Sequence, residues 1–374
     1  MDSLPAPRNR IIFLDNLKIL LAALVVWVHA AQPYGPGGSW FILPPAVLPI
    51  ENIVVIGIFL AVSVSFFMGS FFFISAYFLP GSCDRKGAAR FLRERLIRLG
   101  IPVLILLLTL VPAMNYLFYP QTMSFIDYYL HNTFFTTGNP ALLSFDYLWF
   151  LVLLIAFALL YLALRHTQMT LPPVPFPGQA ALLLTALVLG LAYFVVRIWF
   201  PINQWVLFHT FEPAHLPLYL LMFSGGILAY RNHWLDTIPA SSARLWGAIV
   251  LAGVLVLPPM YLIFGAGNGG LSFGSFLHAI WEAFVGIGML VLLLVLFKKY
   301  LDTAGPVRQA LSENIYAGYL IYLPIVMSLQ WLLIPAEIPM LAKFFLVGTF
   351  SVLICFLASQ YLVRRIPYAE KVIF

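Results

Sequence analysis

The first long apolar run of the chain carries charge where a lipid-embedded segment would normally exclude it. Residues 11–33 read IIFLDNLKILLAALVVWVHAAQP, which is long and apolar enough to cross a bilayer as a helix. Asp15, Lys18 and His29 lie within this run. Ionisable side chains inside a membrane span are costly, and they usually mark a functional path. We therefore expect this segment to form one wall of a buried reaction site.

Helical geometry places these ionisable residues on one face. His29 follows Lys18 by eleven positions, which in an α-helix corresponds to about three turns plus ~20° of rotation and to roughly 16 Å of rise. Asp15 precedes Lys18 by one turn, close to the same face. The charged stripe would therefore run from near one membrane surface well into the bilayer.

Simpler explanations exist for each of these residues. Lys18 is close to the start of the span and could extend its ammonium group to the cytoplasmic headgroups. His29 could be a neutral histidine that is hydrogen-bonded to a neighbouring helix. A basic lead followed by a short apolar core also resembles a signal peptide. However, Asp15 and Lys18 interrupt that core, and the remaining chain needs this segment to balance its topology.

The composition of the chain places most of it in lipid. Of 374 residues, 62% are hydrophobic and only 9% are charged, whereas a soluble domain is about 25% charged. Spans of ~20 residues would fit about ten times. The alternating pattern of a membrane barrel is absent from the sequence, so the spans are expected to be helices. We predict an all-α, polytopic membrane bundle with residues 1–374 as one domain.

The distribution of Lys and Arg predicts the topology. These residues gather in short inner loops, most densely in 81–98, whereas the loops 33–49 and 120–146 have none. The positive-inside rule then places both termini in the cytoplasm. This distribution accounts for the net charge of +6 without a nucleic-acid partner. The predicted spans are residues 11–31, 52–79, 99–119, 147–164, 179–200, 206–230, 245–264, 273–297, 312–334 and 340–363.

Two arginines in the most basic loop have a spacing suited to phosphate. Arg95 and Arg98 are three residues apart, so they share a helix face, and they lie at the mouth of the third span. Arginine forks donate paired hydrogen bonds to phosphate. A phosphate-bearing cofactor could dock there while its tail enters the bundle. Topology alone is sufficient to explain the neighbouring Arg85 and Lys86.

Glu282 lies deep in the eighth predicted span. A buried carboxylate must be protonated or paired, and His278 is its helical neighbour four residues earlier. A structural pair within one helix is one interpretation. The alternative is that Glu282 is a proton partner or orienting acid for His29.

Other candidate groups carry weaker signals. His209, Glu212 and His215 lie near the predicted outer surface with poor metal spacing, and the two cysteines make no metal motif. We therefore expect no metal. Three tyrosines of the ninth span are expected to pack and hydrogen-bond between helices, and any one could line the site: Tyr316, Tyr319 and Tyr322.

Together, several short motifs resemble one family. FLDNLK, followed by the Lys-x10-His spacing, resembles the opening of the acyltransferase 3 family of polytopic membrane acyltransferases. FMGSFFFISAYF resembles the second-helix signature of that family, and RLIRLGIP resembles its Arg-x-x-Arg element. YLWFL and NIYAGYLIYLPIV are similar to weaker blocks. The resemblance covers nearly the whole chain and is greatest to the branch that modifies periplasmic glucans.

The resemblance implies an activity and a set of roles. The family transfers an acyl group, such as acetyl or succinyl, from acyl-coenzyme A to a sugar hydroxyl. His29 matches its essential histidine, Lys18 its intramembrane arginine, and Arg95 with Arg98 its coenzyme-binding pair. The implied location is the inner (plasma) membrane of a bacterial-type cell, with the lipid bilayer, acyl-coenzyme A and a glycan or other hydroxyl acceptor as partners.

The chain departs from the family pattern at three positions. Lys18 replaces arginine, Ala76 replaces the usual glycine after Ser75, and Tyr322 stands where many members have a second histidine. The first change keeps the charge but loses the planar fork of arginine.

These residues predict a mechanism. A thioester is already activated, so the protein needs a base and a means of holding both substrates. We expect His29 to take the proton of the acceptor hydroxyl, with Glu282 or Asp15 orienting it. A route through acylated His29 is a second possibility. The rival class is a transporter or flippase for a glycan or lipid, which fits the hydropathy equally well but leaves Arg95 and Arg98 unexplained.

Overall fold

The computed structural model describes residues 10–36, 41–42, 47–119, 122–133, 145–166, 173–207, 209–265 and 267–373. Across these residues the chain is helical, and its β-structure is limited to one isolated bridge between Val206 and Phe211. The prediction of an all-α polytopic bundle is confirmed.

Nine helical segments of the described residues are long and apolar enough to cross a membrane. Eight of them are built on α1 (Ile12–Ala31), α2 (Ile50–Tyr77), α8 (Trp149–His166), α9 (Gln179–Trp199), α12 (Ser242–Phe264), α13 (Phe273–Tyr300), α14 (Pro306–Leu332) and α15 (Met340–Tyr361). The ninth is the composite segment Ala88–Phe118. Shorter helices are α3 (Leu79–Lys86), α7 (Phe125–Thr133), α11 (Trp234–Thr237) and α16 (Ala369–Val372).

The sixth predicted span is shorter than its apolar pattern indicates. We expected a helix over residues 206–230, but α10 extends only from Leu216 to Arg231. Val206 and Phe211 instead form an antiparallel bridge, and a 3-10 turn at Pro213–His215 then leads into the helix. Proline fits the first turn of a helix, where the N–H group that it lacks has no intrahelical acceptor. The 16 residues of α10 are therefore fewer than the ~20 of a usual span.

The composite third span is divided by two prolines. It consists of α4 (Ala88–Arg95), a π-helical turn (Leu96–Gly100), α5 (Ile101–Leu108) and α6 (Leu110–Phe118). Proline has no N–H, so Pro102 and Pro112 cannot bond to the carbonyl groups four residues earlier. Each of those carbonyls accepts a tyrosine hydroxyl instead: Arg98 O from Tyr316 at 2.6 Å and Leu108 O from Tyr129 at 2.9 Å. The side chains thus complete the backbone bonding that a membrane span requires.

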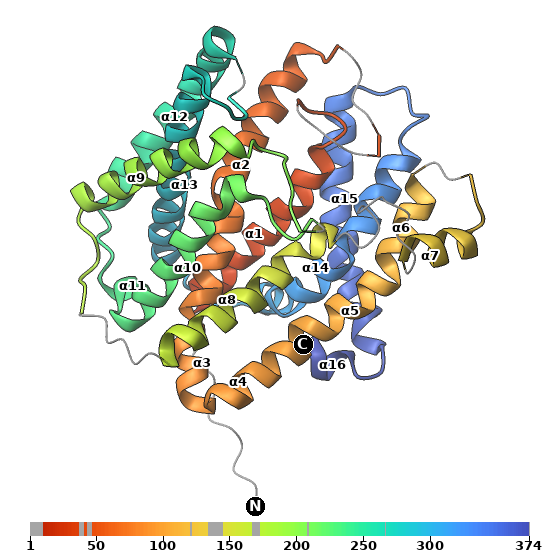
Figure 1. Ribbon diagram of the computed structural model, residues 1–374, viewed down its shortest axis with the longest axis horizontal. Helices are drawn as coiled ribbons and strands as arrows, with labels where there is room; N and C mark the ends of the chain where they lie inside the picture. Colours follow the sequence, from red (N-terminus) through yellow and green to blue (C-terminus); the bar gives the residue numbers. More distant parts are fainter. Residues whose placement is uncertain are drawn as a thin grey trace, which may run out of the picture.

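Helix α1 lies at the centre of the bundle. It packs against α2, α13, α14 and α15, and Figure 1 shows it crossing the middle of the molecule. Helix α10 packs along α2, while α9 and α12 both pack on α13. Helices α5, α6 and α7 lie on the opposite side of the bundle from α9, α12 and α13 (Figure 1).

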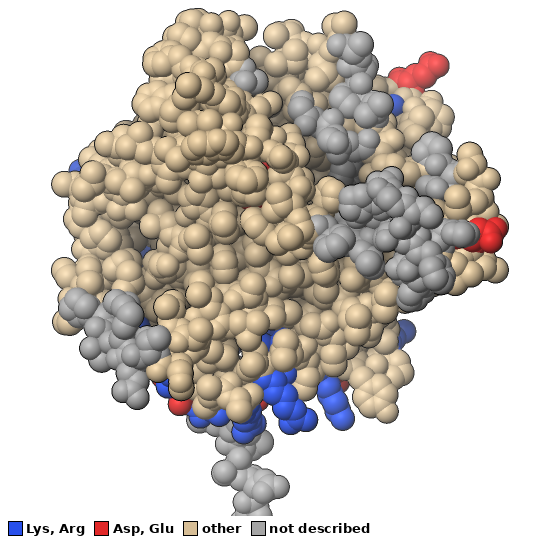
Figure 2. All heavy atoms as spheres, viewed as in Figure 1, with Lys and Arg blue, Asp and Glu red and all other residues tan. Residues whose placement is uncertain are grey.

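One face of the molecule is basic. Lys and Arg gather on the face that is lowest in Figure 2. The start of α1 lies there beside the end of α13, because Asn16 Nδ2 donates to the carbonyl of Leu301 at 2.6 Å. Glu313, near the start of α14, pairs with Arg10 and with Arg364 after α15. The positive-inside rule predicts that this face is cytoplasmic.

The contact between α10 and α2 provides a test of the packing. A Cβ added at Gly226 would lie 2.2 Å from the Phe73 carbonyl oxygen and 2.8 Å from Ala76 Cβ. We expect Gly226→Ala to lower the free energy of unfolding by about 1–3 kcal/mol, the usual effect of overpacking. Its neighbour supplies the control, because a Cβ at Gly225 would meet only the Phe73 ring at 3.7 Å. Thermal unfolding in detergent measures both variants, and equal melting temperatures would contradict this packing.

Candidate active site

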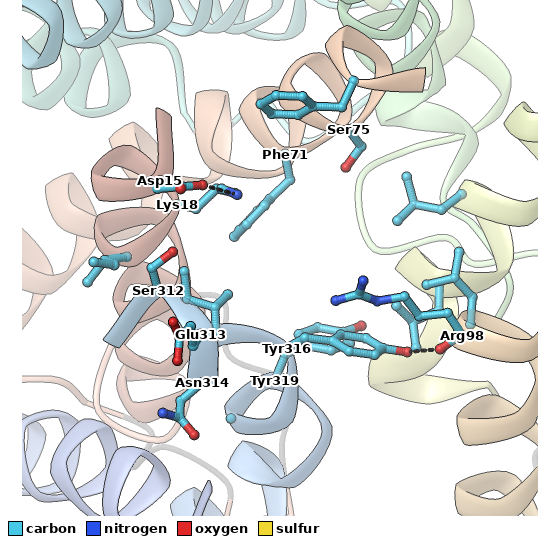
Figure 3. A pocket seen from close by; sticks show the side chains of 18 of the residues that line it. Asp15, Lys18, Phe71, Ser75, Arg98, Ser312, Glu313, Asn314, Tyr316 and Tyr319 are labelled. Atoms are coloured by element: carbon cyan, nitrogen blue, oxygen red, sulfur yellow. Dashed lines mark hydrogen bonds and ion pairs between the residues drawn. The ribbon is translucent and has the colours of Figure 1, made fainter. Parts of the chain in front are cut away.

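A cavity of about 1370 Å³ lies inside the bundle, lined by α1, α2, α4, α8, α14 and α15 (Figure 3). Its lining is charged at the basic face and apolar or aromatic farther along α1. The charged part includes Arg10, Asp15, Lys18, Arg85, Lys86, Arg95, Arg98, Glu313 and Arg364. The inner part includes Val26, Met68, Phe71, Phe150, Tyr319 and Tyr322.

Four of the six predicted site residues line this cavity. Asp15 and Lys18 form an ion pair across one turn of α1, with Lys18 Nζ 2.6 Å from Asp15 Oδ1. Arg10 Nε also donates to Asp15 at 3.2 Å. In Figure 3 the Asp15–Lys18 pair lies across the cavity from Arg98 and Tyr316. Asp15 therefore balances and positions the ammonium group of Lys18, whose Nζ also lies 5.7 Å from the Phe78 ring centre.

Arg95 directly precedes the π-helical turn and Arg98 lies within it, and each is near an aromatic ring. The guanidinium of Arg95 is 5.4 Å from the Phe91 ring centre, and that of Arg98 is 5.7 Å from the Tyr316 ring centre. Such cation–π contacts stabilise a cation beside the face of the ring. The Tyr316 hydroxyl also bonds to the backbone of Arg98, as Figure 3 shows. Arg98 Nη2 donates to the Ile373 carbonyl at 3.3 Å.

His29 lies beside the inner part of the cavity with its ring held at both nitrogens. Its Nδ1 is 2.8 Å from the Val25 carbonyl oxygen, so this nitrogen carries the hydrogen. Its Nε2 is 3.2 Å from the Tyr322 hydroxyl, which can donate to it. Gln330 Nε2 donates to the His29 carbonyl at 3.0 Å. This arrangement leaves Nε2 as the basic nitrogen of a half-buried imidazole.

Two tyrosines of α14, Tyr319 and Tyr322, line the inner part of the cavity, and Tyr147 packs against both. The Tyr147 ring centre is 5.6 Å from that of Tyr322, and its hydroxyl donates to the Leu320 carbonyl at 3.1 Å. The Tyr319 hydroxyl donates to the Tyr147 carbonyl. The sequence predicted that Tyr322 hydrogen-bonds between helices and could line the site, but it did not indicate the partner of this hydroxyl. Its contact with His29 joins residues 293 positions apart, and no local spacing could reveal it.

Glu282 lies in a different cluster and does not line the cavity. Its Oε2 is 2.7 Å from Arg197 Nη1, and its Oε1 is 3.3 Å from His215 Nε2. The helical neighbour His278 is farther away, at 3.9 Å from Oε2. The intrahelical pair expected from the sequence is therefore secondary to contacts with α9 and with the turn before α10.

This second cluster is balanced in charge. The Nδ1 of His215 is 3.1 Å from Glu212 Oε2, so both ring nitrogens face carboxylates and both carry hydrogens. A cationic His215 and Arg197 then neutralise Glu212 and Glu282. All four residues are at most 7% exposed. The Asn203 backbone N–H also donates to Glu212, which connects the cluster to the segment that follows α9.

Among the described residues, no group of three or more His, Cys, Asp and Glu side chains could hold a metal ion. Of the three outer residues with weak metal spacing, Glu212 and His215 belong to the ion cluster. His209 stacks on Trp205 with ring centres 5.9 Å apart.

The fold and this cavity define a polytopic membrane protein with a buried, cationic site. A family model described as an acyltransferase domain, that of acyltransferase 3, matches residues 11–360, and the chain belongs to this family. The resemblance of the sequence motifs to the acyltransferase 3 family is confirmed, and the protein is a membrane acyltransferase. No curated protein and no solved structure gives a significant match to the chain.

The separation of the two clusters predicts that Glu282 acts on stability. Glu282→Gln would leave Arg197 buried without its counter-charge, a defect that usually costs about 3–5 kcal/mol. We expect a lower melting temperature in detergent and a lower yield of folded protein. Glu94→Gln is the control, because its partners Lys86 and Arg90 lie at the surface, where such pairs contribute little. An unchanged melting temperature with abolished turnover would instead favour Glu282 as an orienting acid for His29.

Proposed function

We propose that the protein transfers an acyl group of acetyl or succinyl type from acyl-coenzyme A to a hydroxyl of a glycan or related acceptor. One observation carries the proposal: a continuous cavity has Arg95 and Arg98 at its basic face and Tyr322, the hydrogen-bond partner of His29, at its inner end. The groups proposed to bind phosphate and the hydrogen-bond partner of the proposed base thus line a single space.

The cavity suits a long anionic donor. Its volume of about 1370 Å³ exceeds the ~300–1,000 Å³ of most ligand pockets. The phosphates of coenzyme A would bind Arg95 and Arg98, and the pantetheine arm would extend along α1 past Lys18. His29 is roughly 16 Å farther along this helix than Lys18. The thioester would therefore reach the base while the phosphates stay at the basic face.

The chemistry requires one base and one activated bond. The acceptor oxygen attacks the thioester carbonyl carbon, the C–S bond breaks, and the thiolate leaves. His29 takes the hydroxyl proton at Nε2 and returns it to the thiolate sulfur. The Nδ1–H bond to Val25 fixes the tautomer that this role needs. Transient acylation of Nε2 is the second route, and it uses the same nitrogen.

Asp15 and Glu282 receive different roles in this proposal. The ion pair of Asp15 with Lys18 supports a role in holding the cation beside the donor. The contacts of Glu282 with Arg197 and His215 support a role in holding the bundle together.

The basic face and the position of His29 support transfer across a membrane. The donor would enter from the cytoplasmic side and the acceptor from the other side, in a bacterial-type inner membrane. Membership of the acyltransferase family favours this reaction over the alternative of a transporter or flippase, because a transporter needs neither a base nor a coenzyme site.

The donor site is tested by paired substitutions. We expect Arg95→Ala with Arg98→Ala to weaken coenzyme A binding at least tenfold, since hydrogen bonds to charged groups contribute roughly 1.5–3 kcal/mol each. The matched control is Arg85→Ala with Lys86→Ala, which removes two cations from the same cavity lining. Calorimetric titration measures both, and equal losses would mean that the whole basic loop acts only through its net charge.

The reaction itself is tested in sealed vesicles of known orientation. Labelled acyl-coenzyme A is placed on the cytoplasmic face and a membrane-impermeant glucan on the other. Product is expected only in this arrangement, and His29→Ala should reduce its rate by a factor of about 10²–10⁴, the usual contribution of a general base. Product formed only when both substrates share the cytoplasmic face would refute transfer across the membrane.

A further inference from the structure

The hydroxyl of Tyr322 lies between the cavity and His29. Tyr322 lines the cavity, and its side chain is only 1% exposed. Its oxygen is 3.2 Å from His29 Nε2, whereas His29 is not among the residues that line the cavity. An acceptor hydroxyl that reaches this end of the cavity therefore meets the phenol before it meets the imidazole.

The bonding of His29 leaves one nitrogen for proton transfer. Nδ1 donates to the Val25 carbonyl, so only Nε2 can accept a proton, and the Tyr322 hydroxyl lies on that nitrogen. A phenol is both a hydrogen-bond donor and an acceptor. It can therefore donate its own hydrogen to Nε2 while accepting another from a substrate.

We propose that Tyr322 is a catalytic residue that relays the proton of the acceptor hydroxyl to His29. This inference rests on the function proposed above. As the acceptor oxygen bonds to the thioester carbon, its hydrogen passes to the Tyr322 oxygen and the Tyr322 hydrogen passes to His29 Nε2. When the C–S bond breaks, the same two transfers run in reverse toward the thiolate sulfur. Tyr322 and His29 end the cycle unchanged, and the products are the ester and a neutral thiol.

The surroundings of Tyr322 hold its ring in the position that a relay needs. The His29 ring meets it edge-on with centres 5.0 Å apart, and the centre of the Tyr147 ring lies 5.6 Å from that of Tyr322. Tyr147 is itself fixed by its bond to the Leu320 carbonyl. These contacts keep the phenol directed at Nε2, and preorganisation of this kind is what proton transfer requires.

Tyr319 provides a matched control for the relay. It lies on α14 one turn before Tyr322 and also lines the cavity, but its hydroxyl donates to the Tyr147 carbonyl. Tyr319→Phe therefore removes one buried hydroxyl from the same helix and the same cavity without touching the path to His29.

The experiment compares Tyr322→Phe, Tyr319→Phe and Tyr322→His in the vesicle assay. We expect Tyr322→Phe to lower kcat at least 100-fold, within the range of acid–base catalysis, with unchanged coenzyme A affinity and melting temperature. Tyr319→Phe should retain most of the activity. The rate in mixtures of H₂O and D₂O should depend nonlinearly on the deuterium fraction in the native protein, because two hydrogens move together, and linearly in Tyr322→Phe.

Tyr322→His separates a relay from a merely structural role. An imidazole can also pass a proton, so it should recover part of the activity that Tyr322→Phe loses. That recovered activity should rise with pH, because the introduced imidazole must be neutral to accept a proton. A structural role predicts no recovery, since the smaller polar ring fits the site less well than phenylalanine.

Two results would overturn the relay alone. One is native activity in Tyr322→Phe, and the other is a lowered kcat with the deuterium dependence still nonlinear, which would make Tyr322 a positioning residue. Either result counts against the relay only if the native protein transfers the acyl group and His29→Ala does not. If the native protein makes no product, or if His29→Ala is fully active, the proposed function itself has failed.

Discussion

The free-energy cost of placing charge in hydrocarbon governs where the ionisable side chains of this bundle lie. A charge inside a bilayer persists when it is paired or faces a cavity. Asp15 and Lys18 do both, since they pair with each other on the cavity wall. Arg197 and Glu282 pair directly inside the bundle. The same constraint thus accounts for the charged wall of the cavity and for the buried ion cluster that connects helices. The cavity and the cluster are separate.

A second constraint, complete backbone hydrogen bonding, links the fold to the site. Pro102 leaves the Arg98 carbonyl without its usual helical donor, and the Tyr316 hydroxyl replaces that donor. The same tyrosine places its ring near the Arg98 guanidinium. A local defect in the third span is therefore repaired by α14, and the repair fixes an arginine at the cavity. The π-helical turn beside it is the kind of irregularity that often marks functional positions.

The sequence could predict those features that depend on residues close together in the chain. Hydropathy and charge are local, and they predicted the long helices and the α1 stripe. Local spacing also predicted that Arg95 and Arg98 share a helix face, whereas the family resemblance implied that they share a site with Lys18. The four-residue spacing proposed His278 as the partner of Glu282. The contact of Glu282 with Arg197 could not be predicted, because spacing within one helix carries no information about side chains on another helix. Apolar content extended the sixth span back to residue 206, because it does not register the prolines and turns that precede Leu216.

Lys18 stands where the family pattern has arginine, and the geometry around its ammonium group is compatible with this replacement. An ammonium group has three hydrogen-bond donors and no preferred plane. Asp15 takes one of them at 2.6 Å, and Arg10 shares the charge of Asp15 through its own bond. The acidic side chain is thus divided between two cations, so it neutralises Lys18 only in part. A residual positive charge on the cavity wall, between the basic face and His29, would attract a polar donor arm without the fixed orientation that a guanidinium imposes. For the donor proposed above, the loss of the fork would therefore relax the orientation of the bound donor and preserve its electrostatic attraction to the cavity.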